Sequence, residues 1–352
     1  MPFSLPKAYV KTLEWKNIFS LKSKWELVRA ARQSRMVICF SGAFGVYLKW
    51  LWVFRRFLGL PPVINIATGA DFQEVLSENS RMGIFFRYFV RTCDLNLVSP
   101  YPHMLKNIVR YRIRNIIFSR FPFYVPDGQF RAQGTSGPRL RLFHPSRLDF
   151  KVNDSGDHRF SAKGNDRFLR AFLRALDDGL DAECVVLDRG SDREVARRIV
   201  EQSRHADRFI WKPHLDRERM VQEFLSADLV VDQFDMGWMG LTAVEAMTLC
   251  KPVLIYMHAR CLDILYPETP PIINAHSEDD IYRALMGLPD KEGLRRIGEA
   301  SRDWVIKNHA TESSLDELLF FYTLLTGHIV ADYGWNSDPY AERSGGEKPW
   351  KS

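Results

Sequence analysis

The residue types best suited to chemistry in this 352-residue chain lie at 240–256, which read GLTAVEAMTLCKPVLIY. The pattern predicts a glycine turn, a short helix that carries Glu245, and an apolar strand. A helix that begins at glycine leaves its first N–H groups accessible, and such an end attracts phosphate. A carboxylate one turn further along can accept hydrogen bonds from a ribose. The segment therefore suits a nucleoside diphosphate, although an ordinary helix–strand unit with a solvated glutamate has the same pattern.

Two cations accompany this segment. Arg147 follows a predicted strand, and Lys163 stands before Gly164 at the start of the next helix, while the turn 237–240 follows the strand DLVVDQF. Because ligands bind at the carboxyl ends of strands in open α/β sheets, we expect these three elements to converge. Two cations and a helix N-terminus would offset the charge of a diphosphate. Each cation taken alone is more typical of a solvated surface, so the prediction depends on their convergence.

Short apolar strands alternate with amphipathic helices, a pattern typical of parallel α/β sheets. Strands are predicted at 36–40, 62–67, 95–99, 139–145, 183–188, 208–212, 228–234, 252–257 and 270–275. Helices are predicted at 24–33, 104–118, 163–177, 191–204, 216–226, 241–250, 279–287, 291–307 and 312–326. The segment 121–138 is rich in Pro and Gly, and we interpret it as a domain boundary. We therefore expect one domain at 1–130, a second at 138–330 and a disordered tail at 331–352.

The composition is that of a globular protein with 46% hydrophobic residues and a net charge of +6. A mild positive charge suits an anionic ligand or an anionic membrane. It also suits nucleic acid, but no nucleic-acid-binding module is visible, so no such partner is expected. The five cysteines are scattered without CxxC spacing, which indicates buried thiols in a reducing compartment. No signal peptide is recognisable, and we expect a cytoplasmic protein.

Two segments raise the question of membrane contact. Residues 36–54 are almost wholly apolar and nearly long enough to span a bilayer, but a lysine and two glycines interrupt them. We interpret them as a strand, a glycine turn and a helix with core-facing Leu and Trp. The predicted helix 104–118 has basic residues along one face: Lys106, Arg110 and Arg114. Such a helix either packs in the core with a solvated face or lies on anionic lipid at the inner face of the membrane.

The order and spacing of these motifs resemble the retaining GT-B glycosyltransferases of the GT4 type, the glycosyl transferases group 1 family. The resemblance covers most of 139–327. The family's phosphate-binding element is similar to HPSRLDF followed by KGNDRFLRAF. The family's signature around the ribose-binding helix is similar to the run from ADLVVDQF to GLTAVEAMTLCKPVLIY. PVINIATGADF (62–72) and YVPDG (124–128) resemble shorter family segments. The resemblance implies an α/β protein of GT-B fold. Two Rossmann-like doubly wound parallel-sheet domains would face a cleft, and the N-terminal domain would be reduced.

The resemblance also implies site residues, which are Arg147 and Lys163 as catalytic cations, Gly240, Leu241, Thr242 and Glu245 as donor-binding residues, Asp235 as a substitute sugar contact, Trp211 and Pro213 near the nucleobase, and Gly69 and Asp71 on the acceptor side. It implies transfer of a sugar, with retention, from a nucleotide-diphosphate donor to a glycan or lipid-linked acceptor. The pathway would be cell-surface polysaccharide or glycolipid synthesis. No metal or other cofactor is expected, because cations and a helix N-terminus would stabilise the leaving group.

Three departures from the family pattern are visible. Gly237 stands where the family has the first of two glutamates, the turn at Thr68 and Gly69 lacks a histidine, and the glycine-rich loop after the first strand is missing. These departures keep an alternative open. The chain would then be a non-catalytic GT-B-like protein that binds a nucleotide or glycan as a partner subunit.

Overall fold

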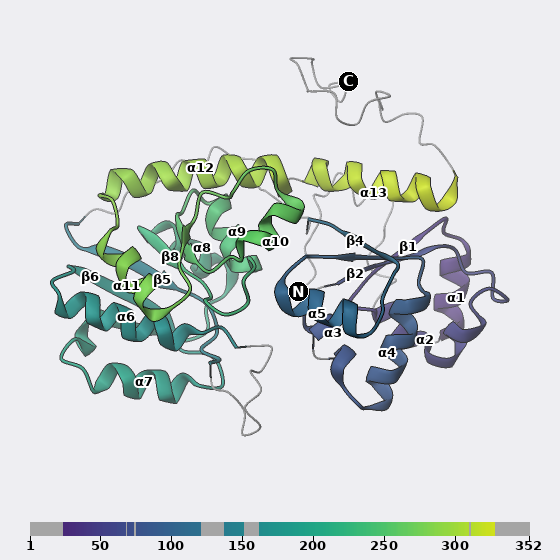
Figure 1. The fold of residues 1–352 in the computed structure, drawn as a ribbon, viewed down its shortest axis with the longest axis horizontal. Coiled ribbons are helices and arrows are strands. Elements are labelled where there is room, and N and C mark those ends of the chain that lie inside the picture. Colours follow the sequence, from purple (N-terminus) through teal and green to yellow (C-terminus); the bar gives the residue numbers. More distant parts are fainter. Residues whose placement is uncertain are drawn as a thin grey trace, which may run out of the picture.

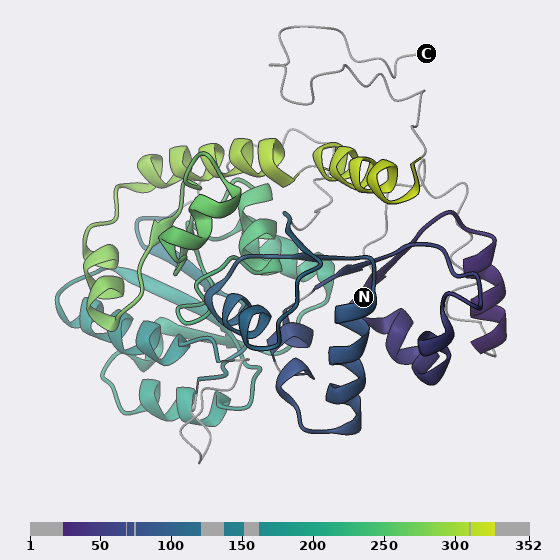
Figure 2. The same ribbon diagram turned by 45° about the vertical axis from the view of Figure 1, so that its right-hand side comes forward.

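The computed structural model describes residues 24–67, 69–73, 75–120, 137–150, 162–309 and 311–327. These residues form two parallel sheets with the strand orders β1-β2-β3-β4 and β10-β9-β8-β5-β6-β7. Helices pack around each sheet, and the two α/β domains stand side by side (Figure 1; Figure 2 after a rotation). The predicted fold class of two parallel-sheet domains, with a smaller first sheet, is confirmed.

The first sheet is built from short, mostly apolar strands. They are β1 Val37–Phe40, β2 Val63–Ile66, β3 Leu95–Val98 and β4 Ile116–Phe118. The helices of this domain are α1 Lys24–Arg32, α2 Ala43–Leu48, η3 Lys49–Phe54, α3 Ala70–Gln73, η4 Val75–Ser77, α4 Arg81–Thr92 and α5 Pro102–Arg110. Every residue of β2 and β3 is buried, as expected for central strands covered on both faces.

The predicted helix 104–118 is wrong beyond its first half. Helix α5 ends at Arg110, Arg112 has a positive φ of 51°, and β4 then pairs with β3. The apolar residues Met104 and Ile108 of α5 are buried. The helix therefore packs into the core through these residues and keeps a solvated basic face, on which Val109 is also exposed.

Residues 36–54 form a strand, a turn and helical segments, as predicted. The turn after β1 contains Gly42, whose N–H donates to Oδ1 of the buried Asn65 at 2.7 Å. The prediction that the tryptophans here face the core holds only for Trp52, which is 1% exposed, whereas Trp50 is 77% exposed. Among the described residues, none of the helices combines the length and apolar character needed to cross a membrane.

The second sheet comprises β5 Leu140–His144, β6 Ala182–Leu187, β7 Phe209–Lys212, β8 Leu229–Val231, β9 Val253–Ile255 and β10 Ile273–Asn274. Its helices are α6 Asn165–Asp177, α7 Arg193–Glu201, η5 Ala206–Arg208, α8 Arg217–Leu225, α9 Leu241–Thr248, α10 Ala259–Leu265, α11 Glu278–Met286 and α12 Lys291–His309. Helices α4 and α10 were absent from the sequence prediction. The chain moves outward from β5 through β6 to β7, then returns to the other side of β5 with β8. The switch point of this doubly wound sheet therefore lies between β5 and β8.

The chain returns to the first domain at its end. Helices α12 and α13 (Thr311–Thr326) lie along one side of both domains (Figures 1 and 2). Phe321 of α13 is 2% exposed and packs against Ile64 and Leu97 of the first sheet. The predicted second domain, 138–330, included this helix, but its apolar face covers the first sheet. The expected tail 331–352, most of the boundary 121–138, the YVPDG motif and Thr68 lie outside the described residues.

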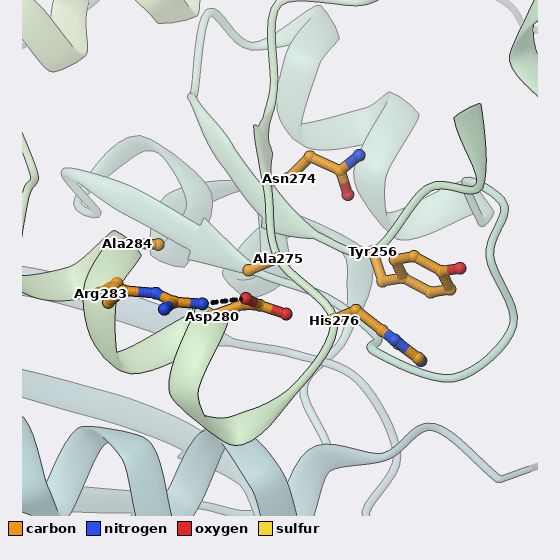
Figure 3. Close-up of a pocket in the computed structure, with 7 residues that line it drawn as sticks. All are labelled: Tyr256, Asn274, Ala275, His276, Asp280, Arg283 and Ala284. Atoms are coloured by element: carbon orange, nitrogen blue, oxygen red, sulfur yellow. Dashed lines mark hydrogen bonds and ion pairs between the residues drawn. The ribbon is translucent and has the colours of Figure 1, made fainter.

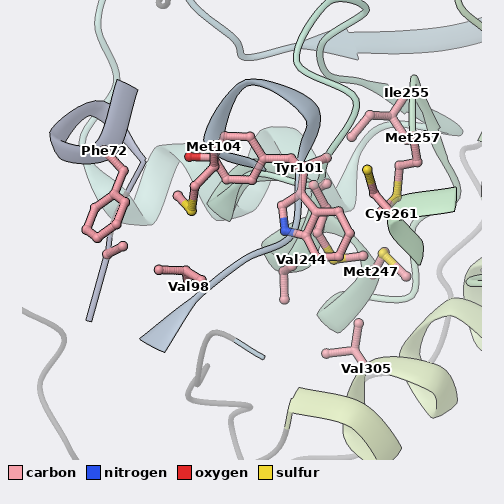
Figure 4. Close-up of a cluster of buried hydrophobic side chains, with 14 of the residues drawn as sticks. Phe72, Val98, Tyr101, Met104, Val244, Met247, Ile255, Met257, Cys261 and Val305 are labelled. Atoms are coloured by element: carbon pink, nitrogen blue, oxygen red, sulfur yellow. The ribbon is translucent and has the colours of Figure 1, made fainter. Parts of the chain in front are cut away.

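An apolar cluster joins the two domains (Figure 4). Tyr101 and Met104 of the first domain belong to one buried cluster with Val244, Met247 and Met257 of the second. Burial of such side chains stabilises each by about 1.5–3 kcal/mol, so the cluster holds the domains together. The five cysteines are all buried free thiols, as expected.

Candidate functional site

Polar residues follow the two strands that meet at the switch point. Ser146 and Arg147 come after β5, and Asp232 and Gln233 come directly after β8. The Ser146 hydroxyl donates a hydrogen bond to Asp232, which is only 3% exposed. This bond joins the two strand ends across the switch point, where open α/β sheets bind their ligands.

Lys163 is fixed at the same place by hydrogen bonds. Its Nζ donates to Oε1 of Gln233 at 2.7 Å, and Nε2 of Gln233 donates to the Trp238 carbonyl at 2.7 Å. Burial lowers the pKa of Lys163, the nearby Asp232 raises it, and Arg147 lowers it. The two cations singled out from the sequence are thus close enough to repel each other.

Asp232 connects Lys163 to the start of α9. Burial raises its pKa, while Lys163, the Ser146 hydroxyl and the amides of Gly240 and Ala243 act in the opposite direction. Oδ2 of Asp232 has no hydrogen-bond partner among the described residues, although these amides lie close enough to favour the charged carboxylate. The Asp232 carboxylate therefore lies between the ammonium and the N-terminus of α9. The structure brings Arg147, Lys163 and this helix end to one edge of the second sheet.

Gly240 precedes α9 with an extended backbone, φ −93° and ψ 177°, which other residues also adopt. A Cβ built there would lie 3.7 Å from both Asp232 Oδ2 and Gln233 Nε2, which are ordinary contacts. Neither the backbone nor the protein packing therefore requires glycine. A missing side chain matters instead for a group that approaches the amides of α9 closely. The next residue, Leu241, is 44% exposed and leaves this end open.

A third cation, Arg189, lies beside Arg147. Its Nη2 donates to the Pro145 carbonyl at 2.8 Å, and burial and Arg147 both lower its pKa. The Arg147 side chain is 55% exposed, with Nε 3.3 Å from Oδ2 of Asp149. Three cations stand against the carboxylates of Asp149 and Asp232, an excess of positive charge that favours an anion. Sequence reasoning missed Arg189, Ser146, Asp232 and Gln233 as site residues. The available signal was the polar residues directly after β5, β6 and β8.

Two predicted donor-binding carboxylates are held in ion pairs. Oε1 of Glu245, on α9, lies 3.0 Å from Nη1 of Arg217, whose side chain is 75% exposed. Such an exposed pair is weak, so Glu245 can exchange this partner for a ligand hydroxyl. Oδ1 of Asp235 lies 3.0 Å from Nη2 of Arg167, with both side chains largely buried. This carboxylate is therefore less available to a sugar than the sequence suggested.

The remaining predicted residues, apart from Thr242, belong to other elements than β5, β8 and α9. Trp211 lies in the edge strand β7, where the Arg197 guanidinium is 4.7 Å from its ring centre, and the exposed Pro213 follows the strand. In the first domain, Oδ1 of the buried Asp71 accepts hydrogen bonds from the amides of Gly69 and Phe72, both at 2.9 Å. This carboxylate thus organises the turn after β2. Thr242, in the first turn of α9, is half-buried.

Another pocket opens between β10 and α11 (Figure 3). Its Tyr256 and His276 rings stack at 4.0 Å. Both polar ends of Asn274 bond to the Met257 backbone, and Asp280 bonds to Ser277 as the cap of α11. The Asn274 amide and the Asp280 carboxylate of this pocket are therefore already hydrogen-bonded within the protein. In the part of the chain that the structure describes, no group of three or more His, Cys, Asp and Glu side chains could hold a metal ion.

Residues 158–304 match the family described as "Glycosyl transferases group 1". No curated protein matches the chain. The matched residues contain Lys163, the Asp232–Gln233 pair and α9, so the predicted resemblance to the glycosyl transferases group 1 family is confirmed for residues 158–304.

Several solved glycosyltransferase structures are similar to the chain. TarM (from S. aureus) has a TM-score of 0.60 and 15% identity over 85% of this chain, and the chain spans only 57% of TarM. HepE of Anabaena in complex with UDP has a TM-score of 0.63 and 11% identity, over 86% of this chain and 82% of HepE. Sucrose-phosphate synthase from Thermosynechococcus elongatus has a TM-score of 0.60 and 13% identity, over 86% of this chain and 78% of the synthase. At these identities the likeness establishes the GT-B fold.

Proposed function

We propose that the chain is a retaining hexosyltransferase of the GT4 type. It transfers a sugar from a nucleotide-diphosphate donor to a glycan or lipid-linked acceptor in cell-surface polysaccharide or glycolipid synthesis. The proposal is carried by the meeting of Arg147, Lys163 and the N-terminus of α9 at the switch point. The family match over 158–304 and the HepE structure solved with UDP support a donor of this class.

In the proposed reaction, the acceptor hydroxyl oxygen bonds to the anomeric carbon on the face from which the diphosphate leaves. The bond between that carbon and the phosphate oxygen breaks, and its electron pair goes to the phosphate. The proton of the acceptor hydroxyl passes to a departing phosphate oxygen. The protein's contribution is then positioning and stabilisation of the negative charge that develops on the leaving group.

Each predicted residue has a role in this proposal. Lys163 and Arg147 bind the phosphates from one side, and the amides that follow Gly240 bind them from the other. Glu245 accepts hydrogen bonds from the ribose. The loop after Trp211, with Pro213, faces the nucleobase, and the turn organised by Asp71 faces the acceptor. No metal is invoked, since the cations and the helix N-terminus offset the diphosphate charge. The proposed location is the cytoplasm, at the inner face of the membrane.

One observation favours a second candidate, a non-catalytic subunit that binds a nucleotide or glycan. Gly237 supplies no carboxylate at the position of the first family glutamate, and the nearby Asp235 is paired with Arg167. A sugar would then be held less firmly than the nucleotide.

Donor hydrolysis separates the two candidates. The chain is assayed for slow hydrolysis of a panel of UDP- and GDP-sugars, beside Lys163→Met and the exposed-lysine control Lys106→Met. We expect hydrolysis of at least one donor, a loss of about a hundredfold in Lys163→Met, and no change in the control. Binding of a nucleoside diphosphate without hydrolysis of any donor would support the non-catalytic candidate. Absence of both would refute both.

A further inference from the structure

The first domain carries an exposed aromatic surface that the site does not use. Along η3 and the turn that follows it, the exposed fractions are 77% for Trp50, 44% for Val53, 55% for Phe54 and 92% for Phe57. Because η3 is a 3-10 helix with three residues per turn, Trp50 and Val53 lie on one of its faces, and Phe54 lies on another face than the buried Trp52. We call these four residues the aromatic surface. Large apolar side chains gathered in this way on a soluble domain indicate an interaction site.

The opposite side of the same segment is firmly attached to the domain. Nε1 of the buried Trp52 donates to Oγ1 of Thr92 at 2.8 Å, and its ring packs edge-on against Phe89 with centres 4.8 Å apart. Nη1 of Arg55 lies 2.8 Å from Oδ2 of Asp94. These contacts with α4 and the turn after it fix the orientation of the segment. The outward position of the aromatic surface is therefore built into the fold.

The stretch of chain that carries this surface has charged residues of one sign only. Residues 27–70 contain six basic residues and no Asp or Glu. Two of the six, Lys49 and Arg56, flank the aromatic surface and are exposed, and neither forms an ion pair with a described residue. An anionic partner would therefore meet no opposing charge from this stretch of the chain.

We propose that the aromatic surface, with Lys49 and Arg56, docks the protein onto an anionic lipid bilayer. Tryptophan and phenylalanine beside lysine and arginine are the residue types that anchor proteins at the membrane interface. The segment is too short to span a bilayer, so it lies in the interface. This inference deepens the proposed function, on which it rests for a lipid-linked acceptor. It also moves the membrane contact from α5, whose Met104 and Ile108 are buried, to η3.

Vesicle co-sedimentation of the full chain tests this surface. The vesicles are phosphatidylcholine with about 30% phosphatidylglycerol, a stand-in for an anionic leaflet. We expect the unaltered chain to bind. The serine variant, which combines Trp50→Ser and Phe57→Ser, should bind more weakly by about tenfold for each lost aromatic group. Lys49→Ala and Arg56→Ala should each weaken binding about fivefold, an effect that added salt reduces. The control Val109→Ser, at a residue of α5 that is 76% exposed, should bind as the unaltered chain does.

Three results would overturn the docking proposal. The first is that the unaltered chain does not bind anionic vesicles. The second is that the serine variant binds them as well as the unaltered chain does. The third is a dimer in sedimentation that Phe57→Ser dissociates, without any binding to vesicles. All variants are also measured for UDP binding by thermal shift and for donor hydrolysis without vesicles, where no change is expected. If the unaltered chain binds UDP but does not bind the vesicles, docking alone is contradicted. Vesicle binding by a chain that neither binds UDP nor hydrolyses donors contradicts the proposed function alone.

Discussion

Replacement of Gly240 by alanine tests whether the start of α9 receives a phosphate. The backbone at this residue, φ −93° and ψ 177°, accepts alanine, and the new Cβ would meet its nearest atoms at 3.7 Å. The free energy of unfolding should therefore change by no more than about 0.5 kcal/mol. Since those nearest atoms belong to Asp232 and Gln233, the methyl group would stand beside these two residues at the switch point.

A phosphate bound to these amides cannot keep its position beside that methyl group. Loss of one hydrogen bond between an amide and a charged oxygen costs about 1.5–3 kcal/mol. UDP should therefore bind Gly240→Ala about tenfold to a hundredfold more weakly. Titration calorimetry with UDP measures this affinity, and urea unfolding measures the stability.

Gly179→Ala is the matched control. Gly179 has a φ of +98° and no atom within 4 Å of a built Cβ, and it follows α6 at the end opposite Lys163. Alanine there is strained by roughly 1 kcal/mol, so stability should fall while UDP affinity stays unchanged. Unaltered UDP affinity in Gly240→Ala would refute phosphate binding at α9. A loss of more than about 2 kcal/mol in its stability would refute the argument that the space is open.

Three further predictions concern other parts of the molecule. His144 is fully buried, and burial lowers its pKa from 6.5 to about 4, so the unfolded chain binds more protons between these values. The contribution of neutral His144 to stability is present above pH 6.5 and is lost as the pH falls toward 4. Urea unfolding should show the free energy of unfolding falling by about 3 kcal/mol over this range. His144→Gln should flatten this dependence on pH. Glu245→Gln should weaken UDP binding about tenfold but leave binding of a dideoxyribose analogue unchanged, and equal losses for both would contradict a ribose contact. Phe321→Ala should lower the free energy of unfolding by about 3–4 kcal/mol, whereas Leu324→Ala, 63% exposed on the same helix, should have little effect.

The sequence by itself determined the elements whose residues are uniform in character. Strands β2 and β3 are apolar runs buried at every position, and their bounds fall within a residue or two of the prediction. The glycine-led helix α9 and the lysine before α6 were also recognisable, because both are patterns of neighbouring residues. Strand β4 was not recognisable, because its three residues continue the apolar spacing of α5. Only the turn at Arg112 separates the strand from the helix.

Tertiary structure alone decided which of these parts meet. The strand order places β8 beside β5, and this brings Asp232 and Gln233 against Lys163 and adds Arg189 from the end of β6. No local pattern encodes that order, since strand pairing joins residues far apart in the chain.

The same reason explains why the two tryptophans of η3 differ in burial. Both stand in one apolar run, but Trp52 is buried because its indole meets Thr92 and Phe89 of α4, while Trp50 points to solvent. Hydrophobicity predicts that a side chain favours burial, and only the packing of distant elements determines which side chains find a partner.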